Sequence, residues 1–110
     1  MSLDPAIRER LEAAAFRRLV DHLQQRTDAQ NIDLMGLAGF CRNCLGDWLH
    51  EAAADEGVAL SKEEGRTLVY GMTPAEFKAK HQSPATPEQM ARMEESLAKN
   101  EAYRAARGGR

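Results

Sequence analysis

The sequence predicts an all-α protein with four or five helices around one long central helix. Two observations support this prediction. Apolar residues recur at three- and four-residue steps, and no stretch alternates apolar and polar residues as a half-buried strand would. Three of the four prolines follow an Asp or a Thr, the arrangement that begins a helix. The length of 110 residues fits a single helical domain spanning 1–110.

Capping signals define the shorter elements. Asp4 and Pro5 predict a first helix that runs to about residue 26. Ser or Thr followed three residues later by Glu or Gln forms a capping box, and the chain has three of them. They predict helices at about 62–70, at 74–80 and from 87 onward. Residues 83–110 are expected to form an accessory C-terminal helix, with a frayed tail from residue 105.

The stretch 32–56 is predicted to be one unbroken helix that stops at Gly57. At about 100° per residue, one sector of this helix gathers the apolar residues and both cysteines. This expected core face comprises Leu34, Leu37, Ala38, Cys41, Cys44, Leu45, Trp48, Leu49 and Ala52. Trp48 is therefore expected in the core.

The opposite side of this helix carries a seam of mostly small residues, namely Gly36, Gly39, Asn43, Gly46 and His50. Glycine inside a helix costs about 0.5–1 kcal/mol relative to alanine, so three glycines suggest close approach by another helix. Because so short a chain has few helices with which to cover two faces, we predict a two-fold symmetric homodimer. Alternatively, the glycines bend the helix or contact capping segments of their own chain.

Composition excludes several functional classes. With 15 Lys+Arg against 17 Asp+Glu, the formal net charge is −2, which argues against nucleic-acid binding. No apolar run is long enough to span a membrane, and no secretory signal is recognisable. Two cysteines three positions apart cannot form a disulfide framework that links distant parts of a secreted fold. We therefore expect a cytoplasmic protein with no membrane association.

Cys41 and Cys44 have the spacing of a redox dithiol or of half a zinc site. Zinc would need further ligands, and His22 near the end of the first helix is the candidate. Redox chemistry would require the helix to break at Gly39 and restart at Cys41, because dithiols act at helix N-termini. The leading interpretation is that both are small core residues, with no cofactor and zinc only as an alternative.

A polar segment joins the first two predicted helices. Arg26, Thr27, Asp28 and Asn31 could bind an anion or a small polar ligand at the start of the following helix. The same side chains could instead cap the helices and fix the turn.

Several segments resemble one family of short bacterial proteins. They are 16–20, 26–28, 30–35, 37–45 and 69–72, and the Phe-Cys-Arg-Asn-Cys-Leu segment at 40–45 is the most specific. The family is catalogued as domain of unknown function 1244, and the resemblance spans roughly residues 9–82. It implies a small helical protein, and it provides no assigned activity or catalytic residues to carry over to this chain. Phe77 stands where a tryptophan is usual.

We therefore expect a cytoplasmic, non-enzymatic helical protein that self-associates and binds a partner protein or a small ligand. The alternative is a thiol-redox or zinc-binding protein that uses Cys41 and Cys44.

Overall fold

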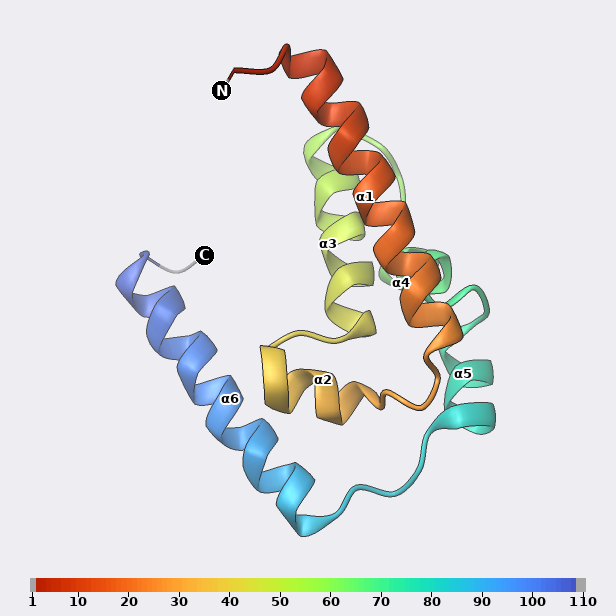
Figure 1. Ribbon diagram of the computed structural model, residues 1–110, viewed down its shortest axis with the longest axis vertical. Coiled ribbons are helices and arrows are strands. Elements are labelled where there is room, and N and C mark those ends of the chain that lie inside the picture. Colours follow the sequence, from red (N-terminus) through yellow and green to blue (C-terminus); the bar gives the residue numbers. More distant parts are fainter. Residues whose placement is uncertain (1, 109–110) are drawn as a thin grey trace.

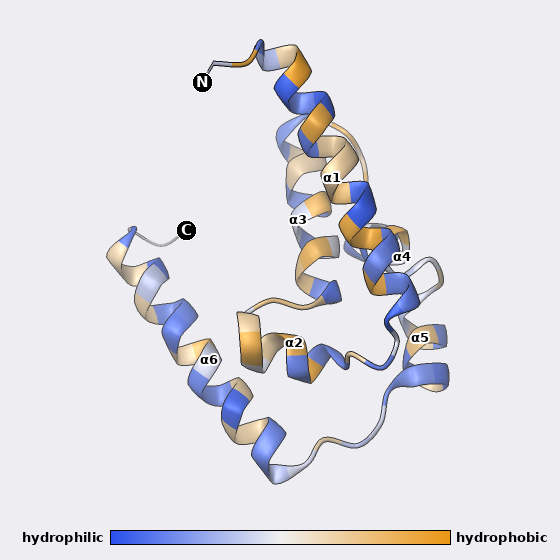
Figure 2. Ribbon diagram, viewed as in Figure 1, coloured by the Kyte–Doolittle hydropathy of each residue, from blue (hydrophilic) through white to orange (hydrophobic). Residues whose placement is uncertain are grey.

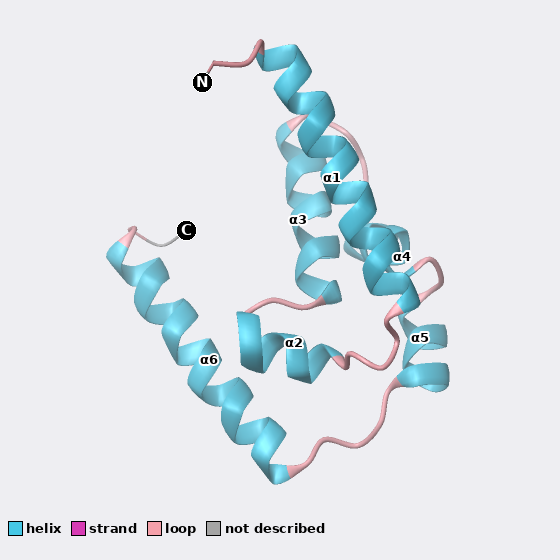
Figure 3. Cartoon of the chain, viewed as in Figure 1, coloured by secondary structure: helices cyan, strands magenta, loops and turns pink. Residues whose placement is uncertain are grey.

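The computed structural model describes residues 2–108 and contains six α-helices. They are α1 (Pro5–Gln25), α2 (Asn31–Ala38), α3 (Arg42–Asp55), α4 (Lys62–Tyr70), α5 (Pro74–His81) and α6 (Pro87–Ala106). The described part of the chain has no β-strand (Figure 3). The all-α prediction is confirmed, with six helices in place of four or five.

The predicted helix starts are confirmed by their capping contacts. Asp4 accepts a hydrogen bond from the amide of Ala6 at the start of α1. Full capping boxes begin α4, α5 and α6, with Ser61, Thr73 and Thr86 as the N-caps. Each box satisfies two backbone donors that a helix start otherwise leaves unpaired. Of the predicted frayed tail, residues 105 and 106 belong to α6, and residues 109 and 110 lie outside the described residues.

The prediction of one helix over 32–56 is wrong. Gly39 adopts a left-handed conformation with φ of 76° and ends α2, and its amide donates to the carbonyl of Met35. Cys41 is extended, and α3 begins at Arg42. Asn100 of α6 holds the break, since its Nδ2 lies 2.8 Å from the carbonyl oxygen of Gly39. Glycine suits this position because it reaches positive φ without a steric penalty.

The break also divides the predicted core face. Leu45 is buried, whereas Leu37 is 75% exposed and Trp48 is 53% exposed. The expectation that Trp48 lies in the core is therefore wrong. The core cluster consists of Leu23, Leu45 and Val69, from α1, α3 and α4. Partly buried apolar residues pack around it, namely Phe16, Val20, Leu34, Phe40 and Leu49.

The six helices pack mainly in pairs. α3 lies against α4, α2 lies against α6, and α1 packs on α4 (Figure 1). The second half of α6 runs away from α3, so that the two helices form the arms of a V. Apolar residues are also present in the parts of α1 and α6 that extend beyond the other helices (Figure 2). None of the helices within residues 2–108 combines the length and apolar character that crossing a membrane requires.

The seam of small residues is covered by other parts of the same chain. A Cβ added to Gly46 would lie 2.5 Å from the Cα of Arg66, so α3 and α4 touch through their backbones. Gly36 instead faces the side chain of Arg92 on α6. His50 Nδ1 lies 2.6 Å from the carbonyl oxygen of Leu60. Close helix approach is thus confirmed at Gly46, but its partner is α4, and the seam gives no reason to invoke a second copy.

Candidate functional site

Arg42, the first residue of α3, is fully buried, with 0% of its surface exposed. Its guanidinium donates to the carbonyl oxygens of three residues, at 2.7 Å to Ala29 and at 2.8 Å to both Leu23 and Arg26. Nη1 also donates to the Asn31 side-chain oxygen at 3.1 Å, and Nε lies 3.3 Å from the Leu23 oxygen. All five guanidinium N–H groups therefore have acceptors within the fold.

The acceptors explain why a cation is tolerated there without a carboxylate. Leu23 and Arg26 supply carbonyls from the C-terminal end of α1, where the helix dipole is negative. The Phe77 ring lies on another side, with its centroid 4.9 Å from the guanidinium carbon. Burial nevertheless lowers the pKa of Arg42 from its ordinary value. The Arg42 guanidinium therefore links the C-terminal end of α1 to the start of α3.

A chain of neutral hydrogen bonds extends from Arg42 to α4. The Asn31 side-chain nitrogen donates to the hydroxyl oxygen of Tyr70 at 2.9 Å, and that hydroxyl donates to the Asn43 side-chain oxygen at 2.6 Å. Tyr70 is buried, and burial raises its pKa. Because the neutral hydroxyl donates one bond and accepts another, this network holds Asn31 and Asn43 in fixed orientations.

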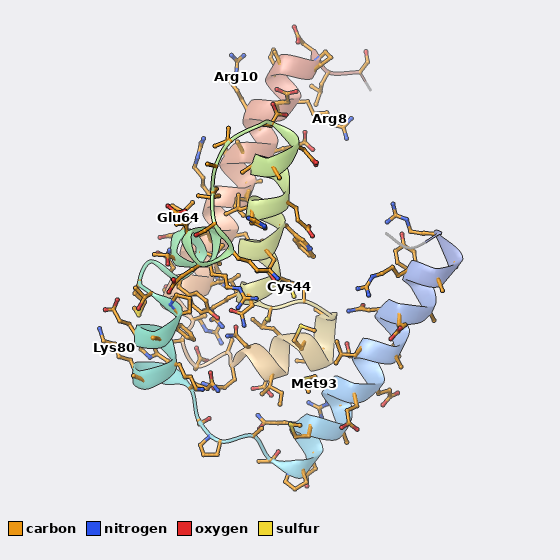
Figure 4. All side chains as sticks on the ribbon, turned by 180° about the vertical axis from the view of Figure 1, so that it is seen from behind. Arg8, Arg10, Cys44, Glu64, Lys80 and Met93 are labelled. Carbon is orange, nitrogen blue, oxygen red and sulfur yellow. The ribbon has the colours of Figure 1, made fainter. Side chains whose placement is uncertain are left out.

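The two cysteines lie at the restart of the helix. Cys41 is the N-cap of α3 and is buried, whereas Cys44 is half-buried. Burial raises the pKa of the Cys41 thiol, and this effect exceeds the opposing influence of the Cys44 and Asn43 amides. The thiols are not joined in a disulfide, and Cys44 Sγ lies 3.8 Å from Met35 Sδ. Figure 4 shows Cys44 on the side of α3 where α2 and α6 meet.

A cavity of about 430 Å³ opens beside Cys41. Its apolar lining comes from α2, α5, α6 and the segment before α6, and comprises Ile32, Met35, Phe77, Pro84, Ala85, Met90 and Met93. Gln30, Asn31, Asn43, Gln82 and Ser83 provide the polar lining. Gln30 fixes one wall, because its amide bonds both the carbonyl of His81 at 2.7 Å and the amide of Ser83 at 3.1 Å.

The structure does not bring His22 together with the two cysteines. His22 is exposed on α1, whereas Cys41 is buried. Among residues 2–108, no three His, Cys, Asp or Glu side chains are grouped so that they could hold a metal ion. The geometry therefore gives the zinc alternative no support.

The predicted polar candidates at 26–31 contact one another and Arg42, and no side chain among them makes a capping hydrogen bond at the start of α2. Arg26 and Asp28 pair with each other through two hydrogen bonds of 2.9 Å. This bonding lowers the pKa of Asp28 to about 2. The side chain of Asn31 is engaged by Arg42 and Tyr70, and Thr27 is half-buried. In this segment, backbone carbonyls accept hydrogen bonds from Arg42, and the charged side chains of Arg26 and Asp28 pair with each other.

Sequence reasoning missed Arg42, Tyr70 and Phe77 as the centre of this arrangement. The signal for Arg42 is its place between two cysteines in an otherwise apolar stretch, where an arginine needs internal acceptors. The signal for Tyr70 is weaker, since a tyrosine before a helix-ending glycine occurs in many contexts. The cavity wall from 82 to 85 has no signal in the sequence beyond Pro84.

The fold and site define a small all-α protein with a largely apolar cavity, two of whose lining residues, Asn31 and Phe77, contact a buried arginine. The chain belongs to the family described as protein of unknown function DUF1244, whose sequence model matches residues 29–95. The match contains Arg42, Tyr70, Phe77 and both cysteines. No curated protein matches the chain.

Proposed function

We propose that this protein acts by binding a small, uncharged and largely apolar ligand in the cavity beside Cys41, without catalysing a reaction. The observation that carries the proposal is the cavity itself. Its volume of about 430 Å³ lies in the range of about 300–1,000 Å³ that is usual for small-molecule sites. Apolar side chains with a few fixed polar groups are also the usual lining of such sites.

The lining favours an uncharged ligand. The nearby cation of Arg42 is fully engaged by carbonyl and amide oxygens, so it has no donor left for an anion. The Asn43 side-chain nitrogen, by contrast, makes no hydrogen bond within residues 2–108, while the oxygen of the same amide accepts from Tyr70. It offers N–H donors to a carbonyl or ether oxygen on an otherwise apolar molecule.

The same lining supports a binding role over catalysis. A cysteine nucleophile needs a neighbouring base or a lowered pKa. The residues that line the cavity include no His, Asp or Glu, and burial raises the pKa of Cys41. We further propose that the protein works in the cytoplasm, where free thiols stay reduced.

Titration with Nile red tests this proposal, because the dye is uncharged, apolar and carries a carbonyl oxygen. We expect saturable binding of one dye per chain. The substitution Ala85→Phe, at an exposed position on the cavity lining, should weaken binding at least tenfold. The matched control Ala14→Phe, on the exposed side of α1, should leave binding unchanged. Equal binding by both variants would contradict the proposal.

A thiol-redox role is the second candidate, and one observation favours it. The helix does break at Gly39, and Cys41 is the N-cap of α3 with Cys44 one turn later. The burial of Cys41 weighs against it, since redox cysteines are accessible and have a low pKa.

Labelling of native protein with a thiol reagent separates the two candidates. Under the binding proposal, the single-cysteine variant Cys44→Ser, which retains Cys41, reacts slowly until denaturant is added. The matched variant Cys41→Ser, which retains the half-buried Cys44, reacts faster. Rapid native labelling of Cys41 would favour the redox role.

A further inference from the structure

The chain exposes more surface than its mass requires. Its accessible surface is 8017 Å², whereas a compact monomer of 12.2 kDa exposes roughly 6,100 Å². Its radius of gyration is 15.6 Å, against about 13 Å for a compact domain of this length. The excess surface is thus about 1,900 Å² per chain by the same scaling. The chain is therefore less compact than a typical single-domain monomer of its mass.

Part of this surface lines an open cleft of about 880 Å³ between the diverging helices α3 and α6. We call it the α3–α6 cleft. Three large side chains that line it are well exposed, namely Trp48 at 53%, Leu97 at 42% and Tyr103 at 63%. Phe40 stacks on Trp48 with a centroid separation of 6.4 Å and continues the apolar floor. Grouped aromatic side chains of this kind mark interaction surfaces.

The two rims of the α3–α6 cleft carry opposite charges. Glu51 lies on the α3 rim, and Arg104 lies on the α6 rim together with Arg107. All three are exposed; Glu51 and Arg104 lie in the C-terminal halves of α3 and α6, and Arg107 follows the end of α6. A 180° rotation about an axis along the cleft exchanges the rims, so that α6 of one copy faces α3 of the other. The cleft is therefore complementary to itself in charge.

We propose that two copies of this chain form a two-fold symmetric homodimer by closing their α3–α6 clefts over each other. In this arrangement the partner's Arg104 approaches Glu51, and the aromatic floors of the two clefts meet. A standard interface buries about 800 Å² per subunit, which is less than the excess surface of the whole chain, and the α3–α6 cleft is one part of that surface. This interface shares only Gly39 with the seam of small residues that α4 and α6 already cover, and it does not depend on a ligand in the cavity.

Light scattering coupled to size-exclusion chromatography tests the dimer and its location. We expect the wild type at micromolar concentration to have twice the chain mass of 12.2 kDa. Leu97→Glu should raise the dissociation constant at least a hundredfold, because it places an unpaired charge on the cleft floor. Leu11→Glu is the matched control, since Leu11 is 54% exposed on α1 and does not line the cleft. It should remain dimeric.

A charge-reversal pair checks the orientation. Arg104→Glu and Glu51→Arg should each weaken the dimer about tenfold, and the double variant should recover most of the loss.

A monomeric wild type would overturn the proposal. So would a dimer that Leu11→Glu dissociates and Leu97→Glu does not, because α1 would then be the interface. Nile red titration of the same variants reports on the cavity separately, so failure of one proposal is distinguishable from failure of the other.

Discussion

The two sides of α3 differ in how completely the chain covers them. On the α4 side the backbones touch at Gly46 and Gly65, and the polar side chains of Arg42 and Asn43 have internal partners. On the α6 side Trp48 is half exposed at the edge of an open cleft. Both sides belong to one helix of 14 residues, so the difference arises from what packs against them.

This difference shows where so small a chain concentrates its packing. On the α4 side, Gly46 and Gly65 allow the two backbones to touch, and the Tyr70 hydroxyl of α4 donates to the side chain of Asn43. The α6 side is covered only near α2, because α6 diverges from α3 towards its C-terminal end (Figure 1). The covered side should therefore be sensitive to single substitutions, and the open side should tolerate them in the isolated chain.

The largest effect is expected for Arg42→Met. The substitution leaves the carbonyls of Leu23, Arg26 and Ala29 buried without their donor, and we expect a loss of about 3–5 kcal/mol in the free energy of unfolding. Urea denaturation followed by circular dichroism measures it. Arg92→Met, at an exposed position on α6, is the control and should change stability by less than about 0.5 kcal/mol. Equal effects of the two variants would contradict the role of Arg42.

The next effect concerns the glycine contact between α3 and α4. Gly46→Ala should destabilise the fold by about 1–3 kcal/mol, because its Cβ would meet the backbone of Arg66. Gly36→Ala is the matched control. Its Cβ would meet only the flexible side chain of Arg92, and the helix propensity of alanine offsets the cost. Thermal unfolding should therefore separate the two variants, and a neutral Gly46→Ala would show that the helices can move apart.

A smaller loss is expected for Tyr70→Phe. It removes the hydroxyl that joins Asn31 and Asn43 while keeping the ring beside Phe77, whose centroid is 4.6 Å away. We expect destabilisation of about 1–2 kcal/mol. Urea denaturation measures this loss, and Tyr103→Phe on the exposed part of α6 serves as its control. A loss no greater than that of the control would show that the network contributes little.

The smallest effect depends on pH. Hydrogen bonding to Arg66 lowers the pKa of Asp47 below its ordinary value. The ion pair therefore adds stability above about pH 3.9, the unfolded value, and loses it as the pH falls through the folded pKa. Because the pair is partly exposed, Asp47→Asn should cost about 1 kcal/mol or less at pH 7. The cost should disappear as the pH falls below the folded pKa of Asp47, and a cost that is independent of pH would contradict this account.

Local capping chemistry allowed most of the helix boundaries to be predicted. Asp4 with Pro5 and the three capping boxes each involve contacts within a few residues, so they act in any tertiary setting. The break at Gly39 was not predicted, although a left-handed glycine cap is a local feature of the chain. A long-range contact accompanies it, because Asn100, 61 positions away, binds the carbonyl of Gly39. Helical periodicity continues across the break, and for that reason it suggested a single helix.

The candidate site was predicted less completely than the fold. Cys41 and Asn43 were singled out, and both line the cavity. Arg42 between them was overlooked, because its burial depends on carbonyls at the end of α1, which no pattern within 40–45 reveals. The segment 82–85 becomes a cavity wall only through the long-range contacts of Gln30.

Trp48 allows the most direct measurement of whether a second copy completes the open side of α3. It is the single tryptophan of the chain, and it lines the α3–α6 cleft. We predict that its fluorescence maximum lies at short wavelength at micromolar concentration and moves to longer wavelength on dilution, in step with the loss of dimer mass. An emission maximum typical of an exposed tryptophan at every concentration would contradict the account.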